Sequence, residues 1–276
     1  MNNIMYAKYK QNSTYPIPED YEIVYRYMPI WKFEDILSKK ALYLSSKYKL
    51  RDGPSGDSME ATSPISASNY AKERLNKTDL FNKDMINDFA KSNKQFQEES
   101  SKRSFSSSWF LGSEESKNMW DKYGDNGQGI VIKTTFLNLR ESFYKIQDFE
   151  KQPESKESQE LFADTVWINK RHYEAYENCQ PSEESYNRNK DLFAFLISKD
   201  RSYEQESEVM VWLPPDFVSS WSDGSFDGVL VSVKLDILID ELIVTTFDRQ
   251  EQVKALLKNN GLNDKKVHLS KVFNIN

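Results

Sequence analysis

The chain has very few residues of the kinds that build metal centres and disulfides. Its 276 residues include one cysteine, Cys179, and two histidines, His172 and His268. A single cysteine excludes an internal disulfide and a thiolate-based zinc cage, and two histidines exclude a site with many imidazole ligands. We therefore expect no zinc-type metal centre, and a protein that suits a reducing compartment.

Long apolar runs and an excess of basic residues are also missing. No segment approaches the ~18 consecutive apolar residues of a membrane span, and the first twenty residues lack the apolar core of a signal peptide. The net charge of -6 disfavours a large basic surface and stable DNA binding, although a local basic groove around a site is compatible with it. We expect a cytoplasmic protein without membrane contact.

Three common catalytic motifs are absent as well. The sequence contains no GxxxxGK[ST] loop, no GxGxxG after its first expected strand and no HExxH. Phosphate-loop, Rossmann and zinc-protease interpretations therefore lack the residues that their chemistry needs.

What the chain does have is 13% aromatic residues and a mixture of strand and helix patterns. The aromatic content predicts a folded protein with an aromatic core. Alternation and helical spacing of apolar residues predict strands at 21–28, 41–46, 104–110, 129–136, 165–176, 209–214, 229–235, 241–247 and 266–273, and helices at 31–40, 68–102, 113–124, 187–199 and 249–259. Long loops are expected at 47–64 and 150–160. Without a regular βαβ repeat, the pattern predicts an α+β fold, with residues 1–276 as a single catalytic domain and a helical segment at about 58–103.

A cluster of glutamates stands out in the segment `SYEQESEVMVWL`, residues 202–213. If this segment is extended, Glu204, Glu206 and Glu208 share one face, because alternate side chains of a strand project together. Neighbouring carboxylates raise one another's proton affinity, so the trio requires cations, hydroxyl donors or a metal. The alternative is a solvated acidic edge with no function beyond solubility.

Two other strands carry polar residues where a core strand has few. Arg26 lies in the middle of the first expected strand, between Tyr25 and Tyr27, where an inward guanidinium needs an anionic partner. Ser104 and Ser106 place two hydroxyls on one face of the strand `SFSSSWF`. The chain order is therefore an arginine strand, a serine strand and paired glutamates before a third strand.

This order resembles the ADP-ribosyltransferases of the arginine, serine, glutamate type. `VYRY`, `SFS` and `ESEVMVWLP` are similar to their three motifs, with Phe105 where threonine is usual. The resemblance implies a core of two small mixed β-sheets with flanking helices, and NAD as substrate. It also implies a role for each site residue. Glu208 would hydrogen-bond the ribose hydroxyl and stabilise the cationic sugar, and Glu206 would orient or deprotonate the acceptor. Arg26 would contact a phosphate, Ser104 with Ser106 would support the NAD pocket and Glu208, and Tyr203 would stack on the acceptor.

A second resemblance extends over nearly the whole chain. The segments `MWDKYGDNGQGIVIKTTF` and `ELIVTTFDRQEQVKALLKNNGLNDKKVHLSKV`, with a lysine followed by Tyr203 and Glu-x-Glu, look like a widespread bacterial domain family of unknown function. Its members usually carry an arginine two residues after the paired glutamates, where this chain has Met210. The resemblance to this family indicates the extent of the domain but says little about its chemistry.

Three functions follow as hypotheses. The first is an NAD-dependent mono-ADP-ribosyltransferase, an intracellular toxin or phage-defence effector that modifies protein or RNA, with an antitoxin protein as a conceivable partner. The second is a non-catalytic binding or regulatory domain whose glutamates hold a basic partner. The third is a metal-dependent nuclease with Glu204, Glu206 and Glu208 as oxygen ligands.

Overall fold

The computed structural model describes residues 4–12, 14–51, 57–78, 80–144, 164–176, 178–215 and 227–273. Its strands are β1 (Ile4–Met5), β2 (Ala7–Tyr9), β3 (Ile23–Met28), β4 (Ala41–Ser46), β5 (Phe105–Leu111), β6 (Ile130–Thr135), β7 (Asp164–Lys170), β8 (His172–Glu174), β9 (Ser198–Asp200), β10 (Glu208–Leu213), β11 (Gly228–Ser232), β12 (Glu241–Val244) and β13 (Lys266–Leu269). Its α-helices are α1 (Ile30–Lys39), α2 (Lys47–Arg51), α3 (Ile65–Asn76), α4 (Lys83–Lys102), α5 (Lys117–Tyr123), α6 (Phe136–Glu141), α8 (Glu183–Asn189), α9 (Ala194–Ile197), α10 (Leu235–Leu238) and α11 (Phe247–Asn259), with short 3₁₀ helices η1 (Asp125–Gly127) and η3 (Arg201–Glu206).

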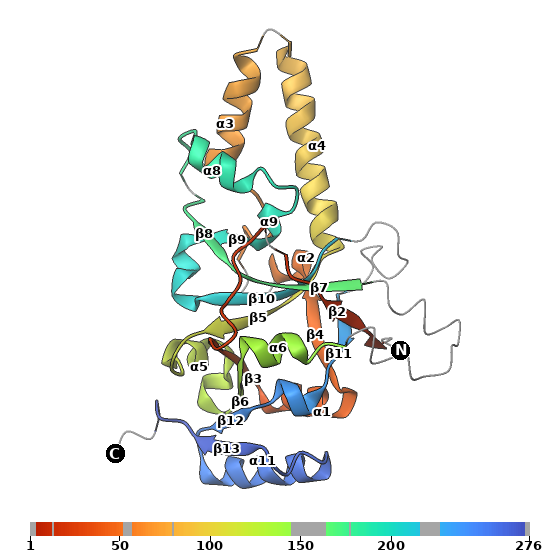
Figure 1. Cartoon of the computed structure of the whole chain (residues 1–276). Coiled ribbons are helices and arrows are strands. Elements are labelled where there is room, and N and C mark those ends of the chain that lie inside the picture. Colours follow the sequence, from red (N-terminus) through yellow and green to blue (C-terminus); the bar gives the residue numbers. More distant parts are fainter. Residues whose placement is uncertain are drawn as a thin grey trace, which may run out of the picture.

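Strand β5 is the branch point of the main sheet (Figure 1). Along one edge it pairs with β10 over its whole length, and β10 continues to β7 and β2. Its other edge is shared by β4 at the start and β3 at the end. From β3 the sheet runs through β6 and β12 to β13, and from β4 it runs through β11 to β1. The strands on which Arg26, the serines and the glutamates lie are therefore direct neighbours.

The mixed architecture confirms the α+β prediction. The sheet count differs from the expected two small sheets, because eleven strands join into one branched sheet and β8 and β9 form a two-stranded sheet. Shared pairing on β5 produces this merger, and strand patterns along the sequence do not reveal it. The expected helical segment is present as α3 and α4, and 165–176 is extended, as predicted, in β7 and β8.

Three local predictions need correction. Residues 201–206 form the 3₁₀ helix η3 instead of extended chain, and Ser207 follows with a φ of 39°, so the three glutamates do not share a strand face. The helix expected at 113–124 begins only after its N-cap residue Ser116. The expected loop at 47–64 begins with helix α2, while the loop at 150–160 lies outside the described residues.

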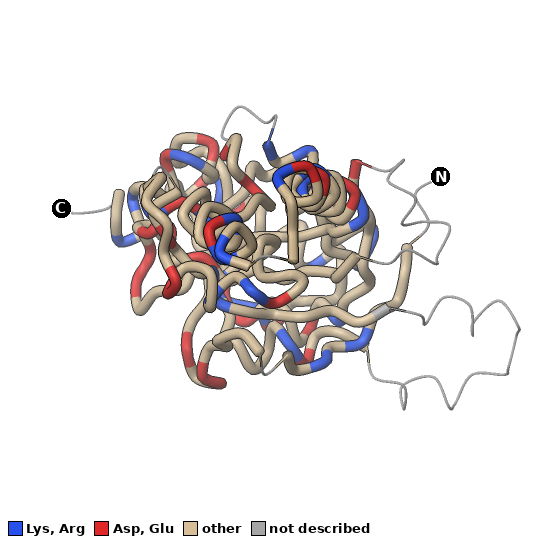
Figure 2. The backbone as a smooth tube through the Cα atoms, turned by 90° about the horizontal axis from the view of Figure 1, so that it is seen from above, with Lys and Arg blue, Asp and Glu red and all other residues tan. Residues whose placement is uncertain are grey.

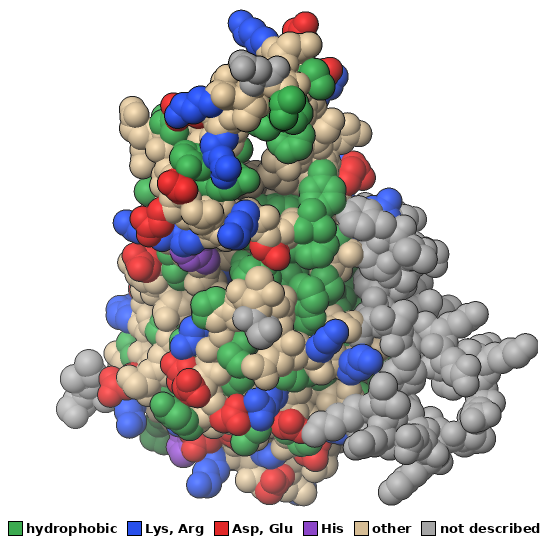
Figure 3. Space-filling model, turned by 45° about the horizontal axis from the view of Figure 1, so that its top comes forward, with side chains coloured by type: hydrophobic (Ala, Val, Ile, Leu, Met, Phe, Trp, Pro, Cys, Tyr) green, Lys and Arg blue, Asp and Glu red, His purple; other side chains and the backbone are tan. Residues whose placement is uncertain are grey.

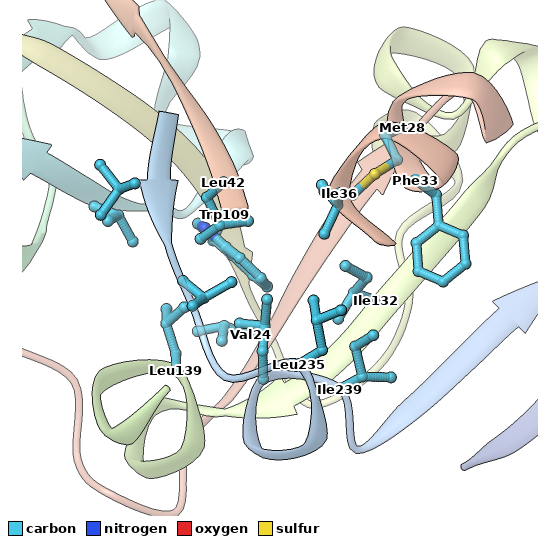
Figure 4. Packing of buried hydrophobic residues seen from close by; sticks show 14 of the residues in the cluster. Val24, Met28, Phe33, Ile36, Leu42, Trp109, Ile132, Leu139, Leu235 and Ile239 are labelled. Carbon is cyan, nitrogen blue, oxygen red and sulfur yellow. The ribbon is translucent and has the colours of Figure 1, made fainter. Parts of the chain in front are cut away.

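The main core lies between the sheet and the helices that cover it (Figure 4). Val24, Trp109 and Ile132 come from three strands of the branched sheet and are almost fully buried, and Phe33 of α1 is equally buried. Burying one large apolar side chain stabilises the fold by roughly 1.5–3 kcal/mol. This packing fixes β3 and β5, and therefore the backbone from which the site residues project.

Helices α3 and α4 form an arm that projects from the sheet (Figure 1). At its base Phe96 packs against Phe195 of α9, with ring centroids 6.2 Å apart. Towards its tip the arm carries hydrophobic side chains on the surface (Figure 3), and Phe81, Met85 and Phe89 are exposed by 41%, 49% and 60%. No helix in the described ranges has the length and apolarity to cross a membrane.

Candidate functional site

The paired glutamates lie where β10 begins, opposite the end of β5. Glu208 is in register with Phe110 of β5, and Tyr25 of β3 faces the same Phe110 from the other edge. Arg26 of β3 and Glu208 of β10 therefore approach each other across one intervening strand. The structure brings these two predicted residues together.

Glu208 is buried and bound by three donors. The Ser108 hydroxyl donates to its Oε1, Lys199 Nζ lies 3.1 Å from Oε2, and Arg171 Nε lies 3.2 Å from Oε1 as an ion pair that is not aligned as a hydrogen bond. Burial alone would raise the pKa of Glu208, but Arg171 and Lys199 outweigh it and hold that pKa well below its ordinary value. The side chain is a permanent carboxylate at any physiological pH.

Glu206 is held by a second set of donors. Its Oε2 accepts a hydrogen bond from Lys199 Nζ at 2.8 Å, and its Oε1 accepts from Lys122 Nζ at 3.1 Å and from the Tyr123 hydroxyl at 3.0 Å. The Lys199 ammonium thus bridges Glu206 and Glu208. Two buried carboxylates can lie side by side here because a cation stands between them.

Behind this pair lies a second layer of buried charges. Glu60 accepts from Lys47 Nζ at 2.5 Å and from Arg171 Nη2 at 2.6 Å, and Arg171 Nη1 donates to the Leu196 carbonyl at 3.0 Å. Burial, reinforced by Arg171, lowers the pKa of Lys47 to about 8. Burial would raise the pKa of Glu60, but Arg171 and Lys47 lower it to about 2. Arg171 therefore ties Glu60 to Glu208 and fixes the position of the latter.

Arg26 supplies a further cation close enough to Glu208 to interact with its charge. Its Nη1 donates to the Ser108 carbonyl. Burial lowers the pKa of Arg26 to about 10 against the opposing effect of Glu208, so the guanidinium stays charged at neutral pH. Lys32, in the first turn of α1, is close enough for Arg26 to lower the pKa of Lys32, although its partial burial lowers that pKa more. In the described part of the chain neither cation has a carboxylate within 4 Å.

The start of α1 adds to this positive potential. Pro29 is its N-cap residue and provides no side-chain acceptor for the first backbone N–H groups of the helix. Unsatisfied N–H groups and the helix dipole favour an anion at such an end. Lys32 and this helix end therefore add positive potential close to Arg26.

The two predicted serines do not contact Glu208, which corrects the role expected of Ser104. The hydroxyl of Ser104 donates to the Leu213 carbonyl at 2.8 Å, at the far end of β10. Ser106 faces Trp212, and its buried hydroxyl has no hydrogen-bond partner among the described residues. Ser108 shares their strand face and is in register with Met210. Its hydroxyl reaches Glu208 and makes the contact expected of Ser104.

Tyr203 lies at the outer side of the site. Its ring is 4.6 Å from Lys199 Nζ and 5.8 Å from Lys122 Nζ, and part of its surface is exposed. Glu204, next along η3, is exposed to solvent. A third tyrosine, Tyr173 of β8, accepts a hydrogen bond from the Glu208 backbone N–H at 2.8 Å through its hydroxyl oxygen.

Residues 119–209 match the model of a protein family described as "Protein of unknown function (DUF2971)". This stretch begins in α5 and ends in β10, so it contains Lys122, Arg171, Lys199, Glu206 and Glu208. The match agrees with the expected likeness to a family of unknown function. No curated protein matches the chain, and no solved structure matches it either.

Proposed function

We propose that the protein is an NAD-dependent mono-ADP-ribosyltransferase. The observation that carries the proposal is the position of Glu208, which is buried, ionised and separated from Arg26 by a single intervening strand. Transfer from NAD breaks the bond between nicotinamide and ribose through a cation-like sugar, and a fixed carboxylate stabilises that charge as it develops. Arg26 and Lys32, which have no carboxylate within 4 Å among the described residues, fit the two negative charges of the diphosphate.

The chemistry assigns one task to each group. An acceptor nitrogen or oxygen forms a bond to ribose C1′, the C1′–nitrogen bond to nicotinamide breaks, and its electron pair stays on the ring nitrogen. The acceptor's proton passes to Glu206 or to water and then to solvent. Glu208 accepts a hydrogen bond from the ribose hydroxyl, and Arg171 and Lys199 hold Glu208 in place.

The alternatives have less support from the geometry. A nuclease needs carboxylates that converge on a metal ion, yet Glu206 and Glu208 are occupied by Lys199, and the described residues contain no group of three or more acidic, histidine or cysteine side chains suited to a metal. A binding domain that holds a basic partner needs free carboxylates, and both are already paired with the chain's own cations. The proposal includes that the protein acts inside the producing cell, as a toxin or a phage-defence effector.

Incubation with NAD labelled in its adenylate phosphate, plus cell lysate, tests the proposal. We expect wild-type protein to release nicotinamide and label an acceptor, and Glu208→Gln and Arg26→Ala to lower both rates by roughly a hundredfold, about 2.7 kcal/mol of transition-state stabilisation each. Glu184→Gln, at an exposed residue, and Arg249→Ala, at a partly exposed one, are controls of the same residue types. Because Glu208→Gln disturbs a buried ion pair, its melting curve must show a folded protein. Absence of both nicotinamide release and labelling in the wild type would refute the proposal.

A further inference from the structure

We propose, on the basis of the transferase function above, that the acceptor is a single-stranded nucleic acid and not an arginine of a protein. Paired glutamates at such a site suggest a cationic acceptor, because two carboxylates could hold a guanidinium. The contacts of Glu206 and Tyr203 in this chain point to an acceptor of opposite charge.

Three of the roughly four acceptor sites of Glu206 are filled, which leaves too few for a bidentate guanidinium. Both of its oxygens already accept hydrogen bonds, one from Lys199 and the other from Lys122 and Tyr123, at 2.8 to 3.1 Å. An arginine acceptor would have to displace a buried lysine and would meet two ammonium groups at close range. The chain's own lysines therefore occupy the place that an arginine acceptor would need.

The same lysines suit a nucleotide. Tyr203 presents a partly exposed ring next to Glu206, with Lys199 Nζ 4.6 Å and Lys122 Nζ 5.8 Å from its centre. Both ammonium groups lie over the ring as cation–π contacts. A base of a single strand stacks on the ring surface that they leave open, and its phosphate contacts a lysine. Lys122 keeps 35% of its side chain exposed, so it can contact a phosphate while it remains close to Glu206.

A local basic site is compatible with the negative net charge of the protein. Lysine, arginine, aspartate and glutamate are interspersed over the molecule (Figure 2), and the overall charge is -6. Non-specific binding of a long duplex is therefore weak, while a short strand that enters the site meets Arg26, Lys32, Lys122 and Lys199. The exposed acidic group beside Tyr203 is Glu204, which forms no ion pair within the described residues.

Binding of fluorescent probes separates the two acceptor classes without any dependence on catalysis. We expect a mixed-sequence RNA oligonucleotide, or the DNA oligonucleotide of the same sequence, to bind with an affinity that falls as salt rises, and an arginine-rich peptide not to bind. Tyr203→Ala should weaken oligonucleotide binding roughly tenfold, and Tyr203→Phe should restore it because the ring returns. Lys122→Gln should weaken it too, whereas Lys117→Gln, on the same helix and paired with Asp121, should not.

The Glu204→Gln variant tests whether the acceptor is negatively or positively charged. Removing this exposed carboxylate should strengthen oligonucleotide binding by roughly two- to fivefold, since an exposed charge contributes little more than that. An arginine peptide that binds the wild type, and binds less well after Glu204→Gln, would overturn the nucleic-acid acceptor. The two proposals fail separately: a wild type that releases nicotinamide but labels only protein refutes the acceptor class alone, while one that releases no nicotinamide under any condition refutes the transferase.

Discussion

At the scale of single residues, Arg171 is the side chain on which the site depends most. It is 1% exposed and lies between Glu60 and Glu208, the two carboxylates whose pKa it lowers. A buried ion pair stabilises a fold little more than well-packed apolar side chains would. Removing one partner, however, leaves the other charge buried and unpaired. The contribution of Arg171 is therefore mainly that it makes the burial of two carboxylates tolerable.

We expect Arg171→Ala to lower the free energy of unfolding by about 3–5 kcal/mol, because Glu60 and Glu208 lose their shared partner. Urea denaturation at pH 7 measures the change. Arg188→Ala is the control, since the Arg188 side chain is 40% exposed, pairs with Glu184 at the surface and lies 3.8 Å from the buried Glu174. An ion pair of such an exposed side chain is worth at most about 1 kcal/mol. A loss below 1 kcal/mol for Arg171→Ala would contradict the account of the buried layer.

The sequence indicated some of these residues and missed others for a clear reason. Arg26, Glu206 and Glu208 could be found because each is a charged residue next to, or inside, a segment with strand character. Glu60 could not, because it lies in a segment without periodicity, and its partners Lys47 and Arg171 are 13 and 111 positions away. An arginine within the predicted strand 165–176 was the one available indication of the second layer, and it does not identify a partner.

At the scale of elements, the transition from η3 to β10 positions the two glutamates. Ser207 ends η3 in the left-handed region, with φ 39° and ψ 54°. Its backbone N–H donates to the Glu204 carbonyl at 3.0 Å and its carbonyl accepts from Leu111 N–H at 2.8 Å. This turn brings both Glu206 and Glu208 within reach of Lys199 Nζ. The extended conformation that the alternating glutamates predicted is replaced by a turn, because the ion pairs of Glu206 and the backbone bonds of Ser207 outweigh strand propensity.

Substitutions of Ser207 test the turn. A left-handed conformation costs a residue with a Cβ roughly 1–2 kcal/mol, and a β-branched side chain suffers most. We expect Ser207→Gly to keep or slightly raise the melting temperature, and Ser207→Val to lower it and to reduce nicotinamide release. Ser202→Val, at the exposed start of η3, controls for β-branching in the same element. Equal melting temperatures for Ser207→Gly and Ser207→Val would show that the turn carries no strain.

Element prediction was good where one periodicity continued over a whole segment. Strand β6 follows from a continuous apolar run that is buried on both faces, with Ile130 and Ile132 in the main core and Val131 in a second cluster. Helix α11 follows from helical spacing, because it buries the face that carries Val253 and Leu257. The branching at β5 could not be predicted, because it depends on which strand pairs with each edge and each half of β5, and pairing partners leave no trace in a single sequence.

At the scale of the whole molecule, the buried charges couple stability to pH. The pKa of Glu60 is about 2 in the folded state against an ordinary value of 4.5, and that of Glu208 is lowered as well. A carboxyl whose folded pKa is depressed contributes stability above its unfolded pKa, and this contribution is lost as pH falls towards the folded pKa. Lys47, with a folded pKa of about 8, is protonated in both states below pH 5 and adds nothing to this acid dependence.

The free energy of unfolding should therefore decrease steeply between about pH 5 and pH 2. Glu60 alone accounts for about 3 kcal/mol of this decrease, since each unit of pKa difference corresponds to about 1.4 kcal/mol. Urea denaturation at a series of pH values, for wild type and Glu60→Gln, measures it. We expect Glu60→Gln to be less stable at pH 7, because Lys47 and Arg171 lose their carboxylate, and to have a flatter acid dependence. Glu184→Gln, at a side chain 78% exposed, should keep the wild-type slope. Parallel curves for wild type and Glu60→Gln from pH 5 to pH 2 would mean that Glu60 does not hold its charge in the folded protein, and the buried layer that supports Glu208 would then be neutral rather than ionic.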